Sequence, residues 1–294
     1  MQTKQEIQAL LAGVAAVPNH RLGQNFLIDK NLLEFLLQQA SVTADDIVFE
    51  VGCGTGTLSQ DLSERAGAVV IVEYDRLMCR ITAGVLAGRE NVTMINADAL
   101  DNKNKVNLEA MQRLAALRRQ FKGRLMLIAN LPYQIAASLM CNLVTAEPVF
   151  DAMYITVQKE VAQRMSAGAG DKHYGILSIL MQAAGNVKLL RKLGPDVFWP
   201  APKVESAMVS YVRDEGKCSL IENPDILKRL ISVFMGHRRK MMKACVKFVP
   251  EEFSGINEWD SLFETARINP QDRPEKVRPE QYVELANAVS QRLK

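Results

Sequence analysis

Several signals that would place a chain in a specialised class are missing from this sequence. Its 294 residues contain no run of about 18 uninterrupted apolar residues, so no membrane-spanning helix is expected. Cysteine is scarce and scattered, with five residues and no Cys-x-x-Cys pair, and there are only three histidines. This scarcity argues against a metal site and a disulfide framework, and it is typical of a reduced cytoplasmic protein. The first 21 residues make a poor signal peptide, because one early lysine is followed only by a short apolar run.

Composition and charge describe an ordinary globular chain with one uneven feature. The hydrophobic fraction is 48% and the charged fraction 23%, which fits one or two folded domains. The net charge is only +3, but residues 188–248 carry 13 Lys and Arg against 6 Asp and Glu. A basic sector beside a near-neutral remainder is typical of a protein that holds a polyanion next to a small-molecule site. A solvated basic helix face gives the same pattern, so charge alone does not decide between them.

Strand-like and helical segments alternate from about residue 30, which predicts an α/β fold with a mostly parallel sheet. The last two strands follow each other without a long helix, which predicts an antiparallel hairpin at one edge of the sheet. The expected strands are 47–51, 69–73, 92–95, 125–129, 151–158, 186–193 and 206–212, and the expected helices 31–40, 58–65, 76–86 and 106–120.

The pattern of apolar residues changes after Asp214. Only helical periodicity follows, interrupted by prolines, and Pro224 is placed to begin a helix. The sequence therefore predicts a catalytic domain over residues 1–215 and a small all-helical domain over 216–294. Within the first, residues 101–123 interrupt the strand rhythm with an Arg- and Lys-rich segment; a surface insertion is favoured there, and RNA contact is the alternative.

A glycine-rich turn follows the first expected strand and begins a helix. Gly52, Gly54 and Gly56 let the backbone turn sharply and approach a ligand without a Cβ atom in the way. A dinucleotide fingerprint, Gly-x-Gly-x-x-Gly, would need its third glycine at position 57, where this chain has Thr57. No Gly-Lys-Ser/Thr follows either, so neither a dinucleotide fingerprint nor a P-loop fits. A Gly-x-Gly-x-Gly turn preceded by an acid, here Glu50, is typical of class I methyltransferases that bind S-adenosyl-L-methionine (SAM).

Acidic residues end the next two expected strands. Glu73 is placed to accept hydrogen bonds from ribose hydroxyls, and Asp98 from the exocyclic amine of an adenine. Either acid alone could be a helix cap. Together with the glycine turn, three such features in register along successive strands predict a SAM site and no metal.

The fourth expected strand ends in Asn130-Leu131-Pro132-Tyr133, where an acceptor base would meet the methyl group of the cofactor. An aryl amine is a poor nucleophile because its lone pair is delocalised into the ring. The side-chain carbonyl of Asn130 and the backbone carbonyl of Leu131 could bind its two hydrogens and favour a pyramidal nitrogen. Pro132 would stiffen the turn and Tyr133 would stack on the base. In isolation, an Asn-x-Pro turn beside a buried tyrosine would explain the same residues.

These motifs, with others along almost the whole chain, resemble the small-subunit ribosomal RNA adenine N6,N6-dimethyltransferase family (KsgA type). The matching segments are Leu22-Gly23-Gln24-Asn25-Phe26-Leu27, the glycine turn, Glu73, Asp98, Asn130–Tyr133, Gln158-Lys159-Glu160-Val161, Tyr174–Ser178, Phe198–Val204, Arg238-Arg239-Lys240, and the late Asn269-Pro270 with Arg273-Pro274-Glu275. Two residues depart from the family pattern: Cys53 replaces the more usual Pro or Ala, and Asn269 replaces the more usual Asp. The 101–123 segment also looks longer than in other members of the family.

The resemblance implies roles for individual residues. Phe198 would stack on the second face of the target adenine, although without the resemblance Phe198 and Trp199 are better explained as core aromatics. Asn130, Leu131, Pro132 and Tyr133 would hold that adenine. The SAM contacts implied are Asn25, Leu27, Gly52, Gly54, Glu73, Asp98 and Asn130, and the expected RNA contacts are Arg238, Arg239, Lys240 and Lys243.

The implied activity is dimethylation of two adjacent adenines in the hairpin loop near the 3′ end of small-subunit ribosomal RNA. The implied substrate is a partly assembled subunit, and the protein would be a cytoplasmic monomer. An enzyme of the related antibiotic-resistance group, acting on large-subunit RNA, is one alternative. A ribosome-assembly or transcription factor without turnover is another. DNA and protein-amide methyltransferases are less favoured, because Asn-Leu-Pro-Tyr replaces their usual Asn-Pro-Pro-Tyr.

Overall fold

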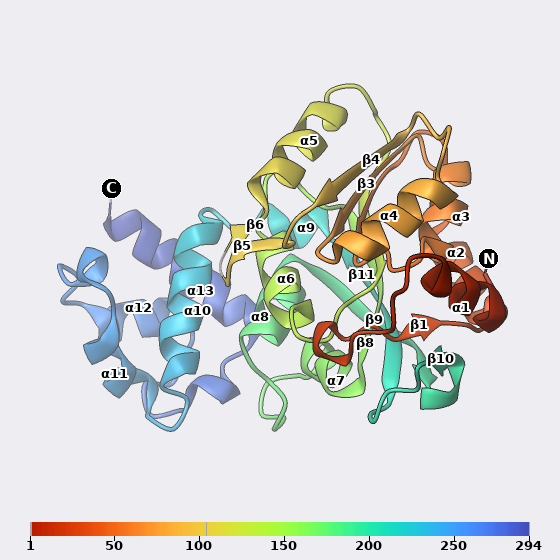
Figure 1. Cartoon of the computed structure of the whole chain (residues 1–294). Helices are drawn as coiled ribbons and strands as arrows, with labels where there is room; N and C mark the ends of the chain where they lie inside the picture. The colour runs from red at the N-terminus through yellow and green to blue at the C-terminus, as the bar shows by residue number, and fades with distance from the viewer. Residues whose placement is uncertain (1, 104, 294) are drawn as a thin grey trace. The chain divides into compact units, whose positions relative to one another are not determined.

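The computed structural model describes residues 2–103 and 105–293 (Figure 1). The chain forms two compact units, each made of two separate stretches of sequence. The sheet unit comprises Met1–Ala162 and Lys188–Val212, and the helical unit comprises Gln163–Val187 and Arg213–Lys294. The predicted division assigned residues 163–187 to the catalytic domain, whereas in the structure these residues cluster with the C-terminal helices.

A seven-stranded sheet with the order β4-β3-β2-β7-β8-β11-β9 forms the centre of the sheet unit. Five neighbouring strands run parallel, and β11 pairs antiparallel with β8 at the side where β9 forms the edge. The predicted α/β class with a mostly parallel sheet is therefore confirmed. The strands are β2 (Ile47–Val51), β3 (Ala68–Glu73), β4 (Val92–Asn96), β7 (Leu125–Asn130), β8 (Ala152–Gln158), β9 (Gly185–Leu193) and β11 (Ser206–Arg213).

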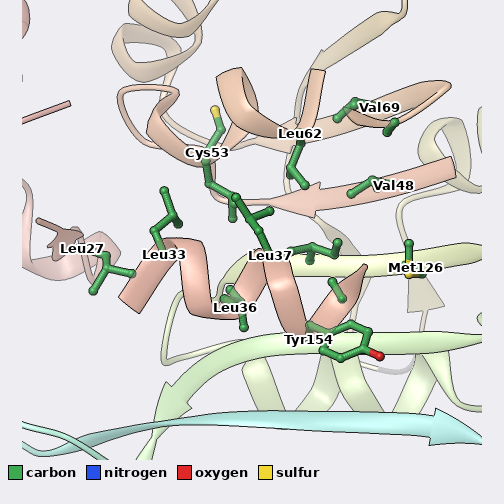
Figure 2. Close-up of a cluster of buried hydrophobic side chains, with 14 of the residues drawn as sticks. Leu27, Leu33, Leu36, Leu37, Val48, Cys53, Leu62, Val69, Met126 and Tyr154 are labelled. Atoms are coloured by element: carbon green, nitrogen blue, oxygen red, sulfur yellow. The ribbon is translucent and has the colours of Figure 1, made fainter. Parts of the chain in front are cut away.

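The helix α2 (Lys30–Ala40) shows how the sequence builds the core beneath one face of this sheet. Asp29 caps its first turn by accepting a hydrogen bond from the Leu32 backbone nitrogen, at 3.1 Å. Leucines at helical spacing, including Leu33 and Leu37, face Val48 and other strand residues in one buried cluster (Figure 2). Replacing a fully buried leucine such as Leu37 by alanine costs roughly 2–5 kcal/mol of stability. The same cluster reaches the strand ends, where Leu33 and Leu36 line a cavity.

The other helices of the sheet unit are no longer than α2. In Figure 1, α1 lies beside α4, where Ile7 and Leu11 pack against Met78 and Ile81. The helices are α1 (Lys4–Gly13), α3 (Thr57–Arg65), α4 (Arg76–Val85), α5 (Leu108–Arg118) and α6 (Ala136–Leu143), with short 3₁₀ turns η1 (His20–Leu22) and η2 (Pro195–Val197). The helix α7 (Lys159–Ser166) begins in the sheet unit and ends in the helical unit. Two small pairings were not predicted: β1 (Phe26–Leu27) with β10 (Phe198–Trp199), and β5 (Leu100–Asn102) with β6 (Lys105–Val106).

The helical unit is built around an aromatic core. Phe234 lies 6.2–6.4 Å, between ring centroids, from Trp259, Phe263 and Tyr282. Prolines begin α10, η5 and α13, where the missing N–H costs no helical hydrogen bond. The elements are α8 (Ile176–Ala184), α9 (Glu215–Cys218), α10 (Pro224–Gly236), α11 (Met242–Cys245), η3 (Val246–Phe248), η4 (Glu251–Phe253), α12 (Trp259–Thr265), η5 (Pro274–Lys276) and α13 (Pro279–Arg292). Across residues 2–103 and 105–293, the structure has no helix with the length and apolarity needed to cross a membrane.

Candidate active site

A cavity of about 340 Å³ lies in the sheet unit, at the carboxyl ends of parallel strands β2, β3 and β7 and beside the turn after β4. This is where ligands bind in open parallel sheets, and the volume is in the range of small-molecule sites. All seven residues predicted to contact the cofactor line it: Asn25, Leu27, Gly52, Gly54, Glu73, Asp98 and Asn130.

The glycine turn after β2 closes one side of the cavity and leaves no room for side chains. Gly52, Gly54 and Gly56 all have positive φ angles, +77°, +57° and +83°. A Cβ atom on Gly52 would lie 2.9 Å from the Pro132 ring, and one on Gly54 would lie 2.8 Å from the Phe26 ring. Glycine is therefore required here by conformation and by contact, so the backbone itself forms the cavity wall.

Glu73, the last residue of β3, is oriented before any ligand binds. Its carboxylate accepts hydrogen bonds from the backbone nitrogens of Asp75, at 2.8 Å, and Gly54, at 3.2 Å. Burial raises the pKa of this carboxyl above its usual range. A carboxylate fixed in this way still has lone pairs directed toward the cavity rim, which suits a ligand that offers hydroxyl groups.

Two further polar groups in the cavity wall are buried without a partner. Glu50 Oε2 and Thr156 Oγ1 have no hydrogen bond within the described parts of the chain, and both residues are 1% exposed or less. Burial raises the pKa of Glu50 to about 8. Buried polar atoms without a hydrogen bond are costly, so their presence in a cavity wall fits a polar ligand that bonds to them. From the sequence, Glu50 was expected only to be the acid that precedes the glycine turn.

Asp98 shapes the turn after β4 and also lines the cavity. Its Oδ1 accepts a hydrogen bond from the backbone nitrogen of Leu100, at 3.0 Å, which shapes the turn after β4. The same side chain is exposed and lines the cavity. Its second oxygen is therefore free to meet a ligand amine while the first fixes the turn.

Asn130 ends β7, and its amide orientation is fixed by a neighbouring loop. Its Nδ2 donates to the backbone carbonyl of Asn25, at 3.0 Å, which leaves Oδ1 on the opposite side of the amide group as an acceptor. A second link joins the same segments, because Gln134 Nε2 donates to the carbonyl of Arg21 at 2.7 Å. The Leu22–Leu27 motif and the Asn130–Tyr133 motif, far apart in sequence, thus form one wall.

The remaining residues of the predicted adenine site lie around this wall. Pro132 lines the cavity, whereas Leu131 is buried behind it. The Tyr133 hydroxyl shares a 2.7 Å hydrogen bond with Ser206 Oγ, and partial burial raises its pKa. Phe198 is 3% exposed, belongs to the buried cluster of Figure 2 and does not line the cavity, so its stacking role stays a prediction.

Gln2 is a site residue that sequence reasoning missed. Its side chain is buried and bonds the glycine turn from outside the cavity: Nε2 donates to the Thr55 carbonyl at 2.9 Å. Oε1 accepts from the hydroxyls of Thr55, at 2.7 Å, and Thr57, at 2.9 Å. A polar residue at the second position of a chain carries no pattern that predicts this contact, because the partners lie more than 50 residues away.

The predicted RNA contacts gather on the surface of the helical unit. Arg238, Arg239 and Lys240 lie between α10 and α11, Lys243 lies within α11, and all four side chains are exposed. In residues 2–103 and 105–293, none of them makes an ion pair with an acid.

Comparison with known proteins decides the family. Residues 17–291 match the sequence model of the ribosomal RNA adenine dimethylase family. The chain belongs to this family. It is 38% identical to ribosomal RNA small subunit methyltransferase A of Alkaliphilus metalliredigens, over 92% of this chain and 91% of that protein. The protein of the same name from Pediococcus pentosaceus is 34% identical over 96% and 93% of the two chains.

Solved structures share the fold. A dimethyladenosine transferase from Plasmodium falciparum superposes with a TM-score of 0.72 at 22% identity, covering 90% of this chain and 98% of that one. The 23S rRNA methyltransferase ErmE gives 0.62 at 20% identity, covering 90% and 100%.

Family membership confirms the predicted enzyme class. The protein is a ribosomal RNA adenine dimethyltransferase, and its methyl donor is SAM. The prediction of an enzyme, rather than a factor that keeps only the fold, is thereby confirmed. The assignment of individual residues to cofactor and RNA rests on the geometry described above.

Proposed function

We propose that this enzyme transfers two methyl groups from SAM to N6 of each of two adjacent adenines in the hairpin loop near the 3′ end of small-subunit ribosomal RNA. The observation that carries the chemistry is the cavity in which the glycine turn, Glu73, Asp98 and Asn130 meet. The relatives named small subunit methyltransferase A support the choice of subunit.

The cavity fits SAM. The backbone of Gly52 and Gly54 would pass along the cofactor, Glu73 would accept from its ribose hydroxyls, and Asp98 from its adenine amine. Asn25 and Leu27 would close over it, and the unpaired carboxyl of Glu50 adds a further acceptor in the wall. When bound, SAM supplies a methyl group on a positively charged sulfur, which is ready for attack by a nucleophile.

The protein's part in catalysis is to position the adenine amine. Asn130 Oδ1 and the Leu131 carbonyl would accept its two hydrogens and turn its lone pair toward the methyl group. The bond from Asn130 Nδ2 to Asn25 holds Oδ1 in the accepting orientation without rearrangement during the reaction. Positioning of this kind needs no strong base, because the proton is lost from an already methylated, cationic nitrogen.

The RNA would be held by phosphate contacts from Arg238, Arg239, Lys240 and Lys243. Such contacts bind the backbone and carry no sequence information, so a partly assembled small subunit would supply the correct placement of the loop. A monomer in the cytoplasm, where subunits are assembled, is part of this proposal.

The test is incubation with labelled SAM and small ribosomal subunits from a strain that lacks this modification, with large subunits in parallel. N6,N6-dimethyladenosine from the small subunit alone supports the proposal. Label in the large subunit alone would assign the enzyme to the antibiotic-resistance group. Absence of label in both, with SAM binding measured separately, would favour a role in assembly without turnover.

A further inference from the structure

One aromatic side chain on the helical unit is exposed where burial is the rule. The chain has ten phenylalanines, all within the described residues, and only Phe248 is exposed, at 42%. It ends the 3₁₀ turn η3, directly after Lys247. Single exposed apolar side chains are common on protein surfaces, so exposure alone assigns Phe248 no role, and the groups around the ring decide what it can bind.

The Phe248 ring is held in one orientation. The His237 imidazole stacks on it with 3.8 Å between ring centroids and 11° between planes. His237 is itself fixed, because its Nδ1 lies 2.9 Å from the Val233 carbonyl in the last turns of α10. A carbonyl can only accept, so Nδ1 carries the proton of this bond. The pair His237–Phe248, which we call the ring pair, is therefore a preorganised aromatic surface.

One cation lies over the Phe248 ring, and four more are close to it in sequence. Lys240 Nζ lies 5.5 Å from the centre of the Phe248 ring. Arg238, Arg239, Lys243 and Lys247 are exposed as well, and none of the five pairs with an acid anywhere in the described chain.

The nearest acids along the chain do not neutralise this charge. Glu251 and Glu252 follow in η4, and the Glu252 carboxylate is already paired with Arg229. Residues 238–247 therefore carry five positive charges, of which Lys240 lies over the ring.

This combination favours one class of ligand. A single exposed ring offers too little apolar area to dock a protein on its own. A duplex would satisfy the cations but would leave the ring without a partner, since its bases are already stacked. Single-stranded RNA offers both phosphates and free base faces, and proteins that bind it combine basic surfaces with aromatic stacking.

We propose that the ring pair is a binding site for one unpaired RNA base, which stacks on Phe248 while the cations from Arg238 to Lys247 bind the flanking phosphates. The proposal deepens the proposed function and rests on its RNA substrate. It assigns to this surface a preference for unpaired nucleotides that phosphate contacts alone would not provide.

The deciding experiment compares two RNA probes: a single-stranded oligoadenylate and an RNA duplex with the same number of phosphates. Binding of the full-length protein is measured by fluorescence anisotropy over a range of salt concentrations. Phe248→Ala should weaken oligoadenylate binding about 10-fold, at the low end of measured base-stacking losses, and leave duplex binding unchanged. The dependence of binding on salt should stay the same, because no phosphate contact is removed.

Matched variants separate stacking from charge and from folding. Phe248→Tyr should restore oligoadenylate affinity, since it keeps the ring. Lys243→Ala should weaken both probes and reduce the salt dependence by about one released ion. Leu220→Ala removes another exposed apolar side chain of the helical unit, 64% exposed, and should change neither probe. Equal losses on both probes in Phe248→Ala, or no loss on either, would overturn the proposal.

A parallel methylation assay keeps this result apart from the proposed function. If wild type methylates small subunits and Phe248→Ala shows no selective loss on oligoadenylate, the ring pair fails and the proposed function stands. If wild type methylates neither subunit, the proposed function fails, and the two probes still decide whether the ring pair binds an unpaired base.

Discussion

The cofactor cavity and the basic surface of the helical unit solve two binding problems in opposite ways. In the cavity, Glu73 and Asn130 already bond to protein groups that fix their orientation. On the basic surface, Arg238 and Arg239 are exposed, and within the described parts of the chain neither pairs with an acid. A reaction that depends on ångström-scale placement needs its groups fixed in advance, whereas a polyanion is held by the sum of many loose charges. This difference predicts that substitutions in the cavity should affect methyl transfer and that substitutions on the basic surface should affect RNA affinity.

The largest effect on methylation should come from Asn130, whose amide is held in the accepting orientation by Asn25. Asn130→Ala removes the acceptor Oδ1, and we expect the methylation rate to fall at least 100-fold, in line with the loss of one preorganised transition-state contact. RNA affinity should change little, because the basic surface is untouched. Single-turnover methylation and subunit binding measured on the same preparation check this. A variant as active as wild type would remove the positioning mechanism.

The complementary change acts on the basic surface alone. Replacing Arg238, Arg239 and Lys240 together by alanine should weaken RNA binding tens-fold at moderate salt and lower the slope of log affinity against log salt by about 2. SAM affinity, measured by calorimetry, should stay the same. A change in SAM affinity without a change in the salt slope would show that the two regions are not separable in the way described.

A smaller effect, on SAM affinity, should come from Gln2, which supports the glycine turn from outside the cavity. Gln2→Ala deletes three hydrogen bonds to the glycine turn and leaves the Thr55 and Thr57 hydroxyls without their acceptor. We expect SAM affinity to drop about 5- to 10-fold, equivalent to roughly 1 kcal/mol, with the rate at saturating SAM nearly unchanged. Gln5→Ala, at an exposed position of α1, is the matched control. A fall in the saturated rate with unchanged SAM affinity would contradict a positioning role.

The last prediction concerns folding stability rather than activity, through pH and Glu50. Burial raises its pKa from an ordinary value near 4.5 to about 8, so between these values the folded chain holds a proton that the unfolded chain releases. The free energy of unfolding should therefore fall as pH rises across this window, by up to about 1.4 kcal/mol per pH unit from this group. Urea unfolding without SAM at several pH values should give a shallower slope for Glu50→Gln than for wild type. Parallel slopes for the two proteins would show that Glu50 keeps its ordinary pKa.

Local patterns explain what could be predicted from the sequence. The strands of the sheet are short buried apolar runs, and the glycine turn and the acid Glu73 follow two of them directly, so strand order alone brings them to one edge. Asn25 and Leu27 were placed at the cofactor by family resemblance, and they do line the cavity. Nothing local in their sequence requires this, because β1 is two residues long and pairs with residues more than 170 positions later.

The remaining features depend on long-range packing. Helix α8 is buried on nearly all sides and packs against α10 and α13, so no amphipathic pattern assigns residues 163–187 to the helical unit. Phe198 shows the limit of carrying a role over by resemblance. An aromatic before a proline commonly packs in a core, and its 3% exposure agrees with that interpretation.

The interleaving of the two units has a consequence for how this chain can be made and cut. Helix α8 is synthesised about 40 residues before α10 and about 100 before α13, two of the helices it packs against. A nascent chain must therefore carry an apolar helix without these partners until α13 has been synthesised, and the helical unit can close only after that. A fragment that begins at residue 216 would lack α8. The surfaces of α10 and α13 that pack against α8 would therefore be exposed to solvent in that fragment. Neither unit corresponds to one uninterrupted piece of the gene.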